Sequence, residues 1–334
     1  MSSENVIKGG SADTMVKKPS LFAKLSKIRE VTIFAVIILL AIILSVISPT
    51  FLTADNLTTT VMGVVMMGIV AVGMTVALVS GGFDLSVGSV MSMAGVLTGS
   101  LALSGMNIWI AALIGLLASL ASGVLTGTFI GKVGINPFIM TLGMQGVIQG
   151  IAYVLTQGAP ISVTGMSPSF LFLGQGKIAG IPTLIWILLI VVIVSDYIMR
   201  RAVVARKVYY LGSNEKAAYL SGVGVARVKI WIYILTAVLS GLAGLLTLSR
   251  FSVAAPTAGI GMELQAIAAC VIGGASLTGG EGTVLGALLG SLLVGLVNDA
   301  LVLLNVSVYW QSLVTGFVLI AAVTLDVLTH RNKA

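Results

Sequence analysis

The sequence predicts an all-α polytopic membrane protein with about ten transmembrane helices, and three observations support this prediction. Hydrophobic residues make up 57% of the 334 residues, whereas charged residues make up only 9%. Soluble globular domains carry about 25% charged residues. Apolar runs of about 20 residues, long enough to cross a bilayer, recur along the chain. A collagen-like chain is excluded as well, because the 40 glycines follow no strict period of three.

The first apolar run starts at Val31, after a polar and basic segment. No small-residue cleavage site follows this run, so we expect a retained span rather than a signal peptide. We predict a cytoplasmic N-terminal tail over 1–30, a transmembrane domain over 31–328 and a cytoplasmic C-terminal tail over 329–334. The ten expected spans are 31–48, 61–80, 85–104, 108–131, 136–156, 181–199, 230–249, 262–278, 284–304 and 311–328.

The basic residues indicate how these spans are oriented. With the N-terminus in the cytoplasm, 16 of the 18 Lys and Arg residues fall on the cytoplasmic side, and the loop 200–229 is their densest internal group. Only Lys177 and Arg250 fall outside. Cytoplasmic loops of membrane proteins carry an excess of Lys and Arg, so this distribution predicts an N-in, C-in topology. The net charge of +7 then reflects topology and does not indicate a nucleic-acid partner.

The loop 200–229 contains the stretch GSNEKAAYLSGVG at 212–224. Asn214 is a good helix N-cap, and Glu215 at the first helical position suits the positive end of the helix dipole. Gly222 fits the position just past a helix end. We therefore expect a helix of about seven residues, roughly 10 Å long, which is marginal alone in water. Such a helix either rests on another surface or simply orders the loop.

Two glycine-rich stretches share a pattern and suggest an internal repeat. GGFDLSVG begins at Gly81 and GGASLTGG begins at Gly273, and each continues into Gly-[Ser/Thr]-Val. Many transporters contain such duplications, in parallel or inverted orientation, and the match leaves that orientation open. The segment 262–283 is either a full span with a glycine-rich turn or a broken, re-entrant helix, because only LQAIAACVI is continuously apolar there.

Four stretches of the chain resemble one known family. The segment with Glu215, Ala217, Ala218 and Gly222 is similar to the Glu-Ala-Ala…Gly coupling motif of bacterial ABC importer permeases, with Lys216 interposed. The other stretches are SGGFDLSVGSVMSMAG (80–95), NPFIMTLGMQGVIQGIAYVLTQGAPI (136–161) and PTAGIGMELQAIAACVIGGASLTGGEGTVLGALLG (256–290). With them the chain resembles the ribose/galactose/xylose-type sugar permeases over nearly its whole length beyond the N-terminal tail.

This resemblance implies a permease domain that moves a monosaccharide, ribose-like or related, across the bacterial cytoplasmic (inner) membrane. It implies a homodimer in membrane lipid, a cytoplasmic ATPase and a periplasmic or lipid-anchored sugar-binding protein. The residues that it implies for coupling to the ATPase are Gly212, Asn214, Glu215, Ala217, Ala218, Tyr219, Leu220 and Gly222. The sugar stays open: ribose, another pentose, a hexose, inositol or a sugar-like signal.

The sequence motifs indicate no enzyme and no cofactor or metal in this chain. No G-x-x-x-x-G-K-[ST] phosphate loop occurs, so we expect ATP and magnesium on the partner ATPase. There is no H-E-x-x-H motif, and Cys270 and His330 are the single residues of their kinds. The alternative function is an ion-coupled secondary transporter of a small polar solute. That class is expected to carry paired intramembrane acids or a histidine relay, which the sequence lacks.

Three polar residues inside or beside the apolar runs are candidates for the translocation path. Asp84 either lines the path or caps the helix that follows it, because Asp is a favoured N-cap residue. Gln145 and Gln149 are four residues apart and so share one helix face. They either offer hydrogen bonds to a passing polyol or tie two helices together.

Four further polar residues lie in the eighth and ninth expected spans. Asn298 and Asp299 lie toward the outer end of the ninth span; a charge buried in lipid is costly and suggests function, unless Asp299 reaches the interface. Glu263 and Gln265 are expected at the outer mouth of the eighth span. They either contact the binding protein or help that helix to start.

Overall fold

The computed structural model describes residues 29–307 and, beyond them, residues 309, 310, 313, 314, 316, 317, 320, 321 and 324. Helices dominate this part of the chain. They are α2 (Arg29–Ile47), α3 (Ala54–Val79), α4 (Val87–Leu103), α5 (Ile108–Thr128) with the π-helical turn η1 (Phe129–Val133), α6 (Pro137–Thr156), α7 (Pro168–Gln175), α8 (Thr183–Arg201), α9 (Val203–Ser213), α10 (Glu215–Leu220), α11 (Val225–Phe251), α12 (Met262–Ile272) and α13 (Val284–Leu303).

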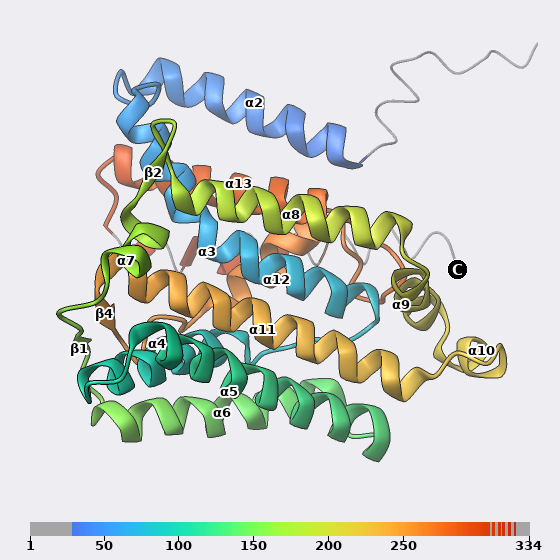
Figure 1. Cartoon of the computed structure of the whole chain (residues 1–334). Coiled ribbons are helices and arrows are strands. Elements are labelled where there is room, and N and C mark those ends of the chain that lie inside the picture. Colours follow the sequence, from blue (N-terminus) through green and yellow to red (C-terminus); the bar gives the residue numbers. More distant parts are fainter. Residues whose placement is uncertain are drawn as a thin grey trace, which may run out of the picture.

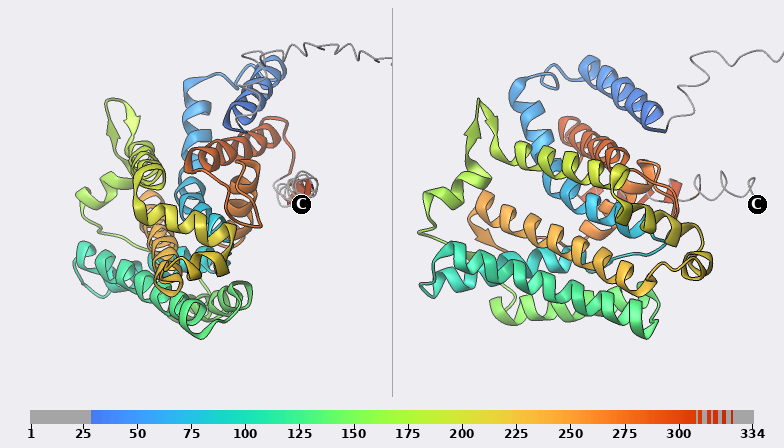
Figure 2. Two further views of the ribbon diagram at one scale, coloured as in Figure 1. Left: turned by 90° about the vertical axis from the view of Figure 1, so that its right-hand side faces the viewer. Right: turned by 45° about the vertical axis from the view of Figure 1, so that its right-hand side comes forward.

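The long helices lie side by side in one bundle, with α2 at the margin opposite α5 and α6 (Figures 1 and 2). Among the described residues, seven helices are long and apolar enough to cross a membrane: α2, α3, α5 with η1, α6, α8, α11 and α13. The chain is therefore an all-α polytopic membrane protein. The tenth expected span, 311–328, and the C-terminal tail fall mostly outside the described residues.

Helix α3 lies at the centre of the bundle, since 83% of its most apolar 18-residue stretch is buried. Close packing of α5 on α11 depends on small residues, because a Cβ at Gly123 would lie 2.6 Å from the carbonyl oxygen of Tyr233. A Cβ at Gly127 would likewise lie 2.7 Å from the Cα of Ile230. Small residues spaced four apart let two membrane helices approach closely, and here they serve packing within the chain.

Two of the expected spans are shorter than predicted. Helix α4 has 17 residues and α12 has 11, which correspond to roughly 25 Å and 16 Å at 1.5 Å per residue. The hydrocarbon core of a bilayer is about 30 Å thick. The expected full span over 262–278 is therefore wrong, and the broken alternative holds, because the helix stops at the glycine pair that begins with Gly273.

The two ends of the bundle differ in their connecting elements. At one end lie α7 and the two-stranded pairs β1 (Ile161–Ser162) with β4 (Val253–Ala254) and β2 (Lys177–Ile178) with β3 (Ile181–Pro182) (Figure 1). At the other end lie α9 and α10, together with the beginning of α2 (Figure 1). The sequence analysis foresaw neither the strands nor α7 and α9.

Candidate functional site

Helix α10 is capped at both ends by its own sequence. The side-chain Oδ1 of Asn214 accepts a 2.9 Å hydrogen bond from the N–H of Ala217, which makes Asn214 the N-cap. At the other end the N–H groups of Gly222 and Val223 donate to the carbonyl oxygens of Tyr219 and Ala218, each at 3.0 Å, and Gly222 has a φ of +81°. This is the Schellman pattern, which glycine favours because it lacks a Cβ. The predicted caps are confirmed, and the helix has six residues.

The side chains of α10 divide into an inner and an outer set. Ala218 is only 4% exposed, whereas Tyr219 and Leu220 are 69% and 76% exposed. An ion pair of 2.7 Å between Glu215 and Lys229 ties the helix to the start of α11. Only one of the two predicted alanines, Ala217, thus faces outward, where Tyr219 and Leu220 add two exposed apolar side chains.

A hollow of about 920 Å³ opens beside α10, between α8, α9 and α11. Its apolar lining includes Val204, Trp231 and Leu235, and Lys207 and Arg227 add two cationic groups. An apolar floor with basic groups at its edge suits a protein partner that brings apolar anchors and acidic residues. With the exposed face of α10, this hollow forms what we call the coupling surface.

The end of α9 connects the coupling surface to both glycine-rich repeats. A Cβ on Gly212 would fall 1.8 Å from the carbonyl oxygen of Val79 and 2.6 Å from the nitrogen of Gly280. The Tyr209 hydroxyl donates a 2.9 Å hydrogen bond to the carbonyl oxygen of Gly282. Burial raises the pKa of Tyr209, which keeps that hydroxyl protonated and donating. The end of α9 therefore packs directly against the turns before α4 and before α13.

A second group of polar residues lies inside the bundle, around Glu263. Its Oε1 lies 3.5 Å from Nε2 of Gln145, and its Oε2 is buried with no hydrogen-bond partner among the described residues. Glu263 is 9% exposed, so its side chain is buried inside the bundle. Gln265, two residues on, is half-buried.

The amide of Gln149 joins three segments near Glu263. Its Nε2 donates to the carbonyl oxygen of Pro256 at 2.6 Å, and its Oε1 accepts from the hydroxyl of Ser89 at 3.2 Å. Ser92, one turn along α4, accepts from the N–H of Gly259 at 2.8 Å. Glu263, Gln145, Gln149, Ser89 and Ser92 form what we call the polar cluster. The sequence analysis singled out its two glutamines and Glu263 but missed the serines, whose spacing of three on α4 was the available signal.

Asp84 lies outside the polar cluster and is satisfied locally. Its Oδ1 accepts 2.9 Å and 2.6 Å hydrogen bonds from the N–H and the hydroxyl of Ser86. Asp84 thus orders the turn just before α4, whose N-cap position is Ser86 itself. The carboxylate is 2% exposed.

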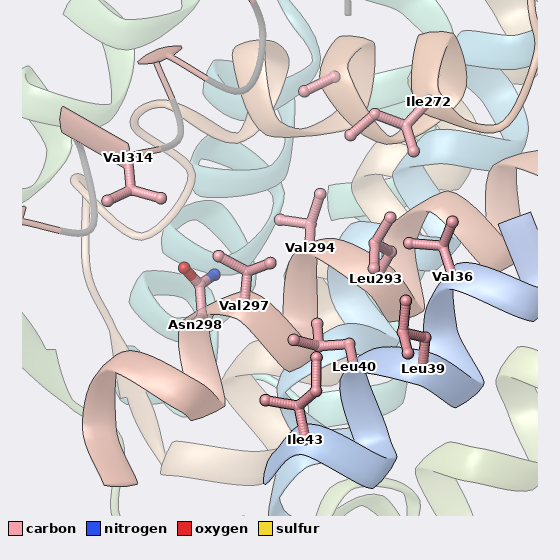
Figure 3. A pocket seen from close by; sticks show the side chains of 11 residues that line it. Val36, Leu39, Leu40, Ile43, Ile272, Leu293, Val294, Val297, Asn298 and Val314 are labelled. Carbon is pink, nitrogen blue, oxygen red and sulfur yellow. The ribbon is translucent and has the colours of Figure 1, made fainter. Parts of the chain in front are cut away.

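The two polar residues of α13 also lie apart from the polar cluster. Asp299 accepts a 3.0 Å hydrogen bond from the side-chain nitrogen of Asn56 on α3. Asn298 borders an apolar pocket of about 340 Å³ between α2, α12 and α13, among aliphatic side chains such as Leu40 and Val294 (Figure 3). The structure therefore brings together the candidates on α6 and α12 but not those on α13.

The described residues contain no group of three or more His, Cys, Asp or Glu side chains that could hold a metal ion. Cys270 is buried, and its sulfur lies 3.3 Å from both the hydroxyl of Thr75 and the carbonyl oxygen of Ala71. The titratable groups that could do chemistry are thus dispersed, and the polar cluster is equipped for hydrogen bonding.

The described residues thus form a multi-pass helical bundle with an exposed apolar helix, α10, at one end and a polar cluster inside. A family model described as "Branched-chain amino acid transport system / permease component" matches residues 56–323. The chain belongs to this family of permease components. It is a non-catalytic, multi-pass protein of the cytoplasmic membrane.

Several curated proteins are similar over about three quarters of the chain. The ribose import permease protein RbsC of Haemophilus influenzae is 41% identical over 256 residues, which cover 76% of this chain and 79% of that protein. The D-allose transport system permease protein AlsC of Escherichia coli is 36% identical over 76% of this chain and 78% of its own. The L-arabinose ABC transporter permease protein AraH of Azospirillum brasilense is 36% identical over 76% of this chain and 74% of that protein. No solved structure matches the chain.

Proposed function

We propose that the chain is the permease subunit of an ATP-binding-cassette importer for a monosaccharide. The relatives named for ribose, D-allose and L-arabinose transport support the substrate class. The observation that carries the proposal is α10, a short helix that is capped at both ends and exposes Tyr219 and Leu220. An ion-coupled secondary transporter has no need of such a docking helix, and the family disfavours that alternative.

The two ends of the bundle suit two different partners. The ATPase docks on the coupling surface, and it carries the ATP and magnesium. A periplasmic or lipid-anchored sugar-binding protein docks at the opposite end, where α7 and the strand pairs lie. We include Gln265 among the residues that contact this protein. Glu263 is too deeply buried to contact it directly.

The end that carries α10 faces the cytoplasm, because the basic residues of α9, α10 and the start of α11 lie there. Lys177 and Arg250, the two basic residues assigned to the outside, belong to elements at or next to the opposite end. The broken segment 252–283 still leads from the end with β4 to the turn beside Val79, so it counts as one crossing. With 311–328 as the last crossing, the number is even and both termini are cytoplasmic.

A second copy of the chain covers α6 and completes the path. Only 17% of the most apolar 18-residue stretch of α6 is buried by the described residues. Gln145 and Gln149 lie half-buried in the middle of this helix. Both glutamines bond inward yet stay partly exposed. Polar groups that are partly exposed to lipid are costly, so a protein surface or a water-filled path is expected beside them. A Cβ at Gly143, Gly146 or Gly150 would meet nothing within 4 Å, which leaves room for a closely packed second copy.

Reconstitution tests the proposed function. The permease, its ATPase and its binding protein are incorporated into proteoliposomes, and uptake of labelled ribose, allose and arabinose is measured with and without ATP. We expect uptake of at least one sugar that needs ATP and the binding protein together. Uptake that follows a proton or sodium gradient and ignores ATP would establish the secondary transporter instead.

A further inference from the structure

We infer that Glu263 is the hydroxyl-accepting and charge-selecting residue of the path, which favours neutral polyols and excludes anionic sugars. This inference rests on the proposed function, because it names a residue that touches the transported solute. It is based on a buried hydrogen-bond acceptor that lacks a donor in the part of the chain that the structure describes. A carboxylate oxygen, Oε2 of Glu263, is buried without a hydrogen-bond donor among the described residues.

A buried carboxylate oxygen without a donor is costly inside a membrane protein and suggests a function. Glu263 is 9% exposed, and among the described side chains Gln145 donates to its other oxygen, Oε1, at 3.5 Å. Asp84, a more deeply buried acid, differs because two groups of Ser86 donate to it. The buried Oε2 of Glu263 thus has no donor in the described part of the chain, and a solute hydroxyl would supply one.

The backbone around Glu263 favours a negative charge at this position. Glu263 lies in the first turn of α12, and its Oε2 would lie 2.8 Å from a Cβ built on Gly88 in the first turn of α4. Two helix N-termini therefore meet at this carboxylate, and each carries a partial positive charge. Their approach requires glycine, because a Cβ on Gly88 would lie 2.1 Å from the carbonyl oxygen of Gly259.

The neighbouring side chains fit a polyhydroxylated solute. Gln145 and Gln149 lie half-buried one turn apart on α6 and bond inward, and each amide both donates and accepts. A sugar hydroxyl donates to the open oxygen of Glu263 and accepts from such an amide at its other lone pair. A sugar acid brings a second carboxylate toward Glu263, and like charges at this distance repel strongly in a low-dielectric interior.

The binding protein would itself reject many solutes, so the test uses the purified permease with its ATPase and no binding protein. Saturation-transfer NMR measures contact with D-ribose and with D-ribonate in the wild type and in E263Q, E263D and D55N. D55N is the matched control, because Asp55 is an exposed acid at the start of α3. ATP-driven uptake of the native sugar is measured in parallel in the full system.

For the wild type and D55N we expect a ribose signal and no ribonate signal. E263Q should gain a ribonate signal and lose at least fivefold in sugar uptake, whereas E263D should keep ribonate excluded. E263D also decides the matter if E263Q does not fold, because a ribonate signal in E263D would overturn the inference. Equal NMR patterns and equal uptake in E263Q and the wild type would overturn it too. If the wild type itself shows no ATP-driven uptake of any sugar, the proposed function fails rather than this inference.

Discussion

The backbone N–H of Gly280 donates a 2.8 Å hydrogen bond to the carbonyl oxygen of Val79, across 201 positions of the chain. This bond joins the turn before α4 to the turn before α13, and Gly212 at the end of α9 lies against both partners. The two repeat-like hairpins thus turn at the same end of the bundle, as parallel copies would. Gly212 therefore packs the end of α9 against both of them.

Gly212→Ala should disturb the junction at which the end of α9 packs against Val79 and Gly280. The new Cβ would lie 1.8 Å from the carbonyl oxygen of Val79, so backbone atoms must move. Overpacking of this kind costs about 1–3 kcal/mol. We expect lower thermal stability in detergent and a greater loss of ATP-driven uptake, while the exposed face of α10 still binds the ATPase.

Gly63→Ala is the matched control for Gly212→Ala, because a Cβ at Gly63 in α3 would meet nothing within 4 Å. Alanine is about 1 kcal/mol better than glycine inside a helix, so this variant should keep or gain stability. Equal transport by Gly212→Ala and Gly63→Ala would show that the junction does not transmit motion.

Asn214→Ala should weaken coupling by fraying α10. The lost cap costs about 1 kcal/mol, and a helix of six residues has little else to hold its first turn. Asn214→Asp supplies the control, since Asp caps about as well as Asn. We expect uptake to fall several-fold for Ala and to stay near wild type for Asp; equal activity of the two variants would show that the cap is dispensable.

Leu220→Asp should abolish docking without unfolding the protein. The side chain is 76% exposed, so the folded permease loses little, whereas a docked ATPase would have to bury a charge against an apolar contact. We expect at least tenfold weaker co-purification with the ATPase and an unchanged melting temperature. Ile178→Asp, an exposed apolar position on β2 at the opposite end, should co-purify normally.

Ala218→Arg is a poor substitute for Leu220→Asp. Ala218 is 4% exposed and faces the body of the protein, so arginine there would displace α10 itself. Lost docking in that variant would not distinguish a damaged helix from a damaged contact.

Short-range chemistry explains what the sequence could predict. Apolar runs define where helices lie, and Asn214 and Gly222 define both ends of α10, because caps depend on neighbouring residues. The lengths of α4 and α12 depend instead on where backbone segments from different parts of the chain meet. Gly88 approaches Gly259 across the bundle, and no local pattern reports that contact.

The position of Glu263 illustrates the same limit. An acid at the start of an apolar run resembles a residue at the membrane surface, so the sequence placed it at an outer mouth. In the structure α12 starts beside α4 inside the bundle, and Glu263 is buried with it. The burial follows from long-range packing rather than from the residues next to it.

The topology can be measured with single cysteines. Thr164→Cys and Lys216→Cys place exposed thiols at opposite ends of the bundle, and the native Cys270 is fully buried and should not react. In intact spheroplasts a membrane-impermeant maleimide should label only Thr164→Cys, because α10 faces the cytoplasm in the proposed orientation. Labelling of Lys216→Cys before lysis would reverse the orientation.

Asp84 offers a test that separates a structural carboxylate from one in the path. Its Oδ1 accepts from the N–H and the hydroxyl of Ser86, and the amide oxygen of Asn can accept both bonds. Asp84→Asn should therefore keep its melting temperature and most of its sugar uptake. Asp84→Ala leaves a buried N–H without an acceptor, which costs about 1–3 kcal/mol, so stability and uptake should fall together. Melting in detergent and ATP-driven uptake, measured on both variants, distinguish the two roles. A stable Asp84→Asn protein without transport would show that the carboxylate charge acts in the path, because both hydrogen bonds to Ser86 would still be available.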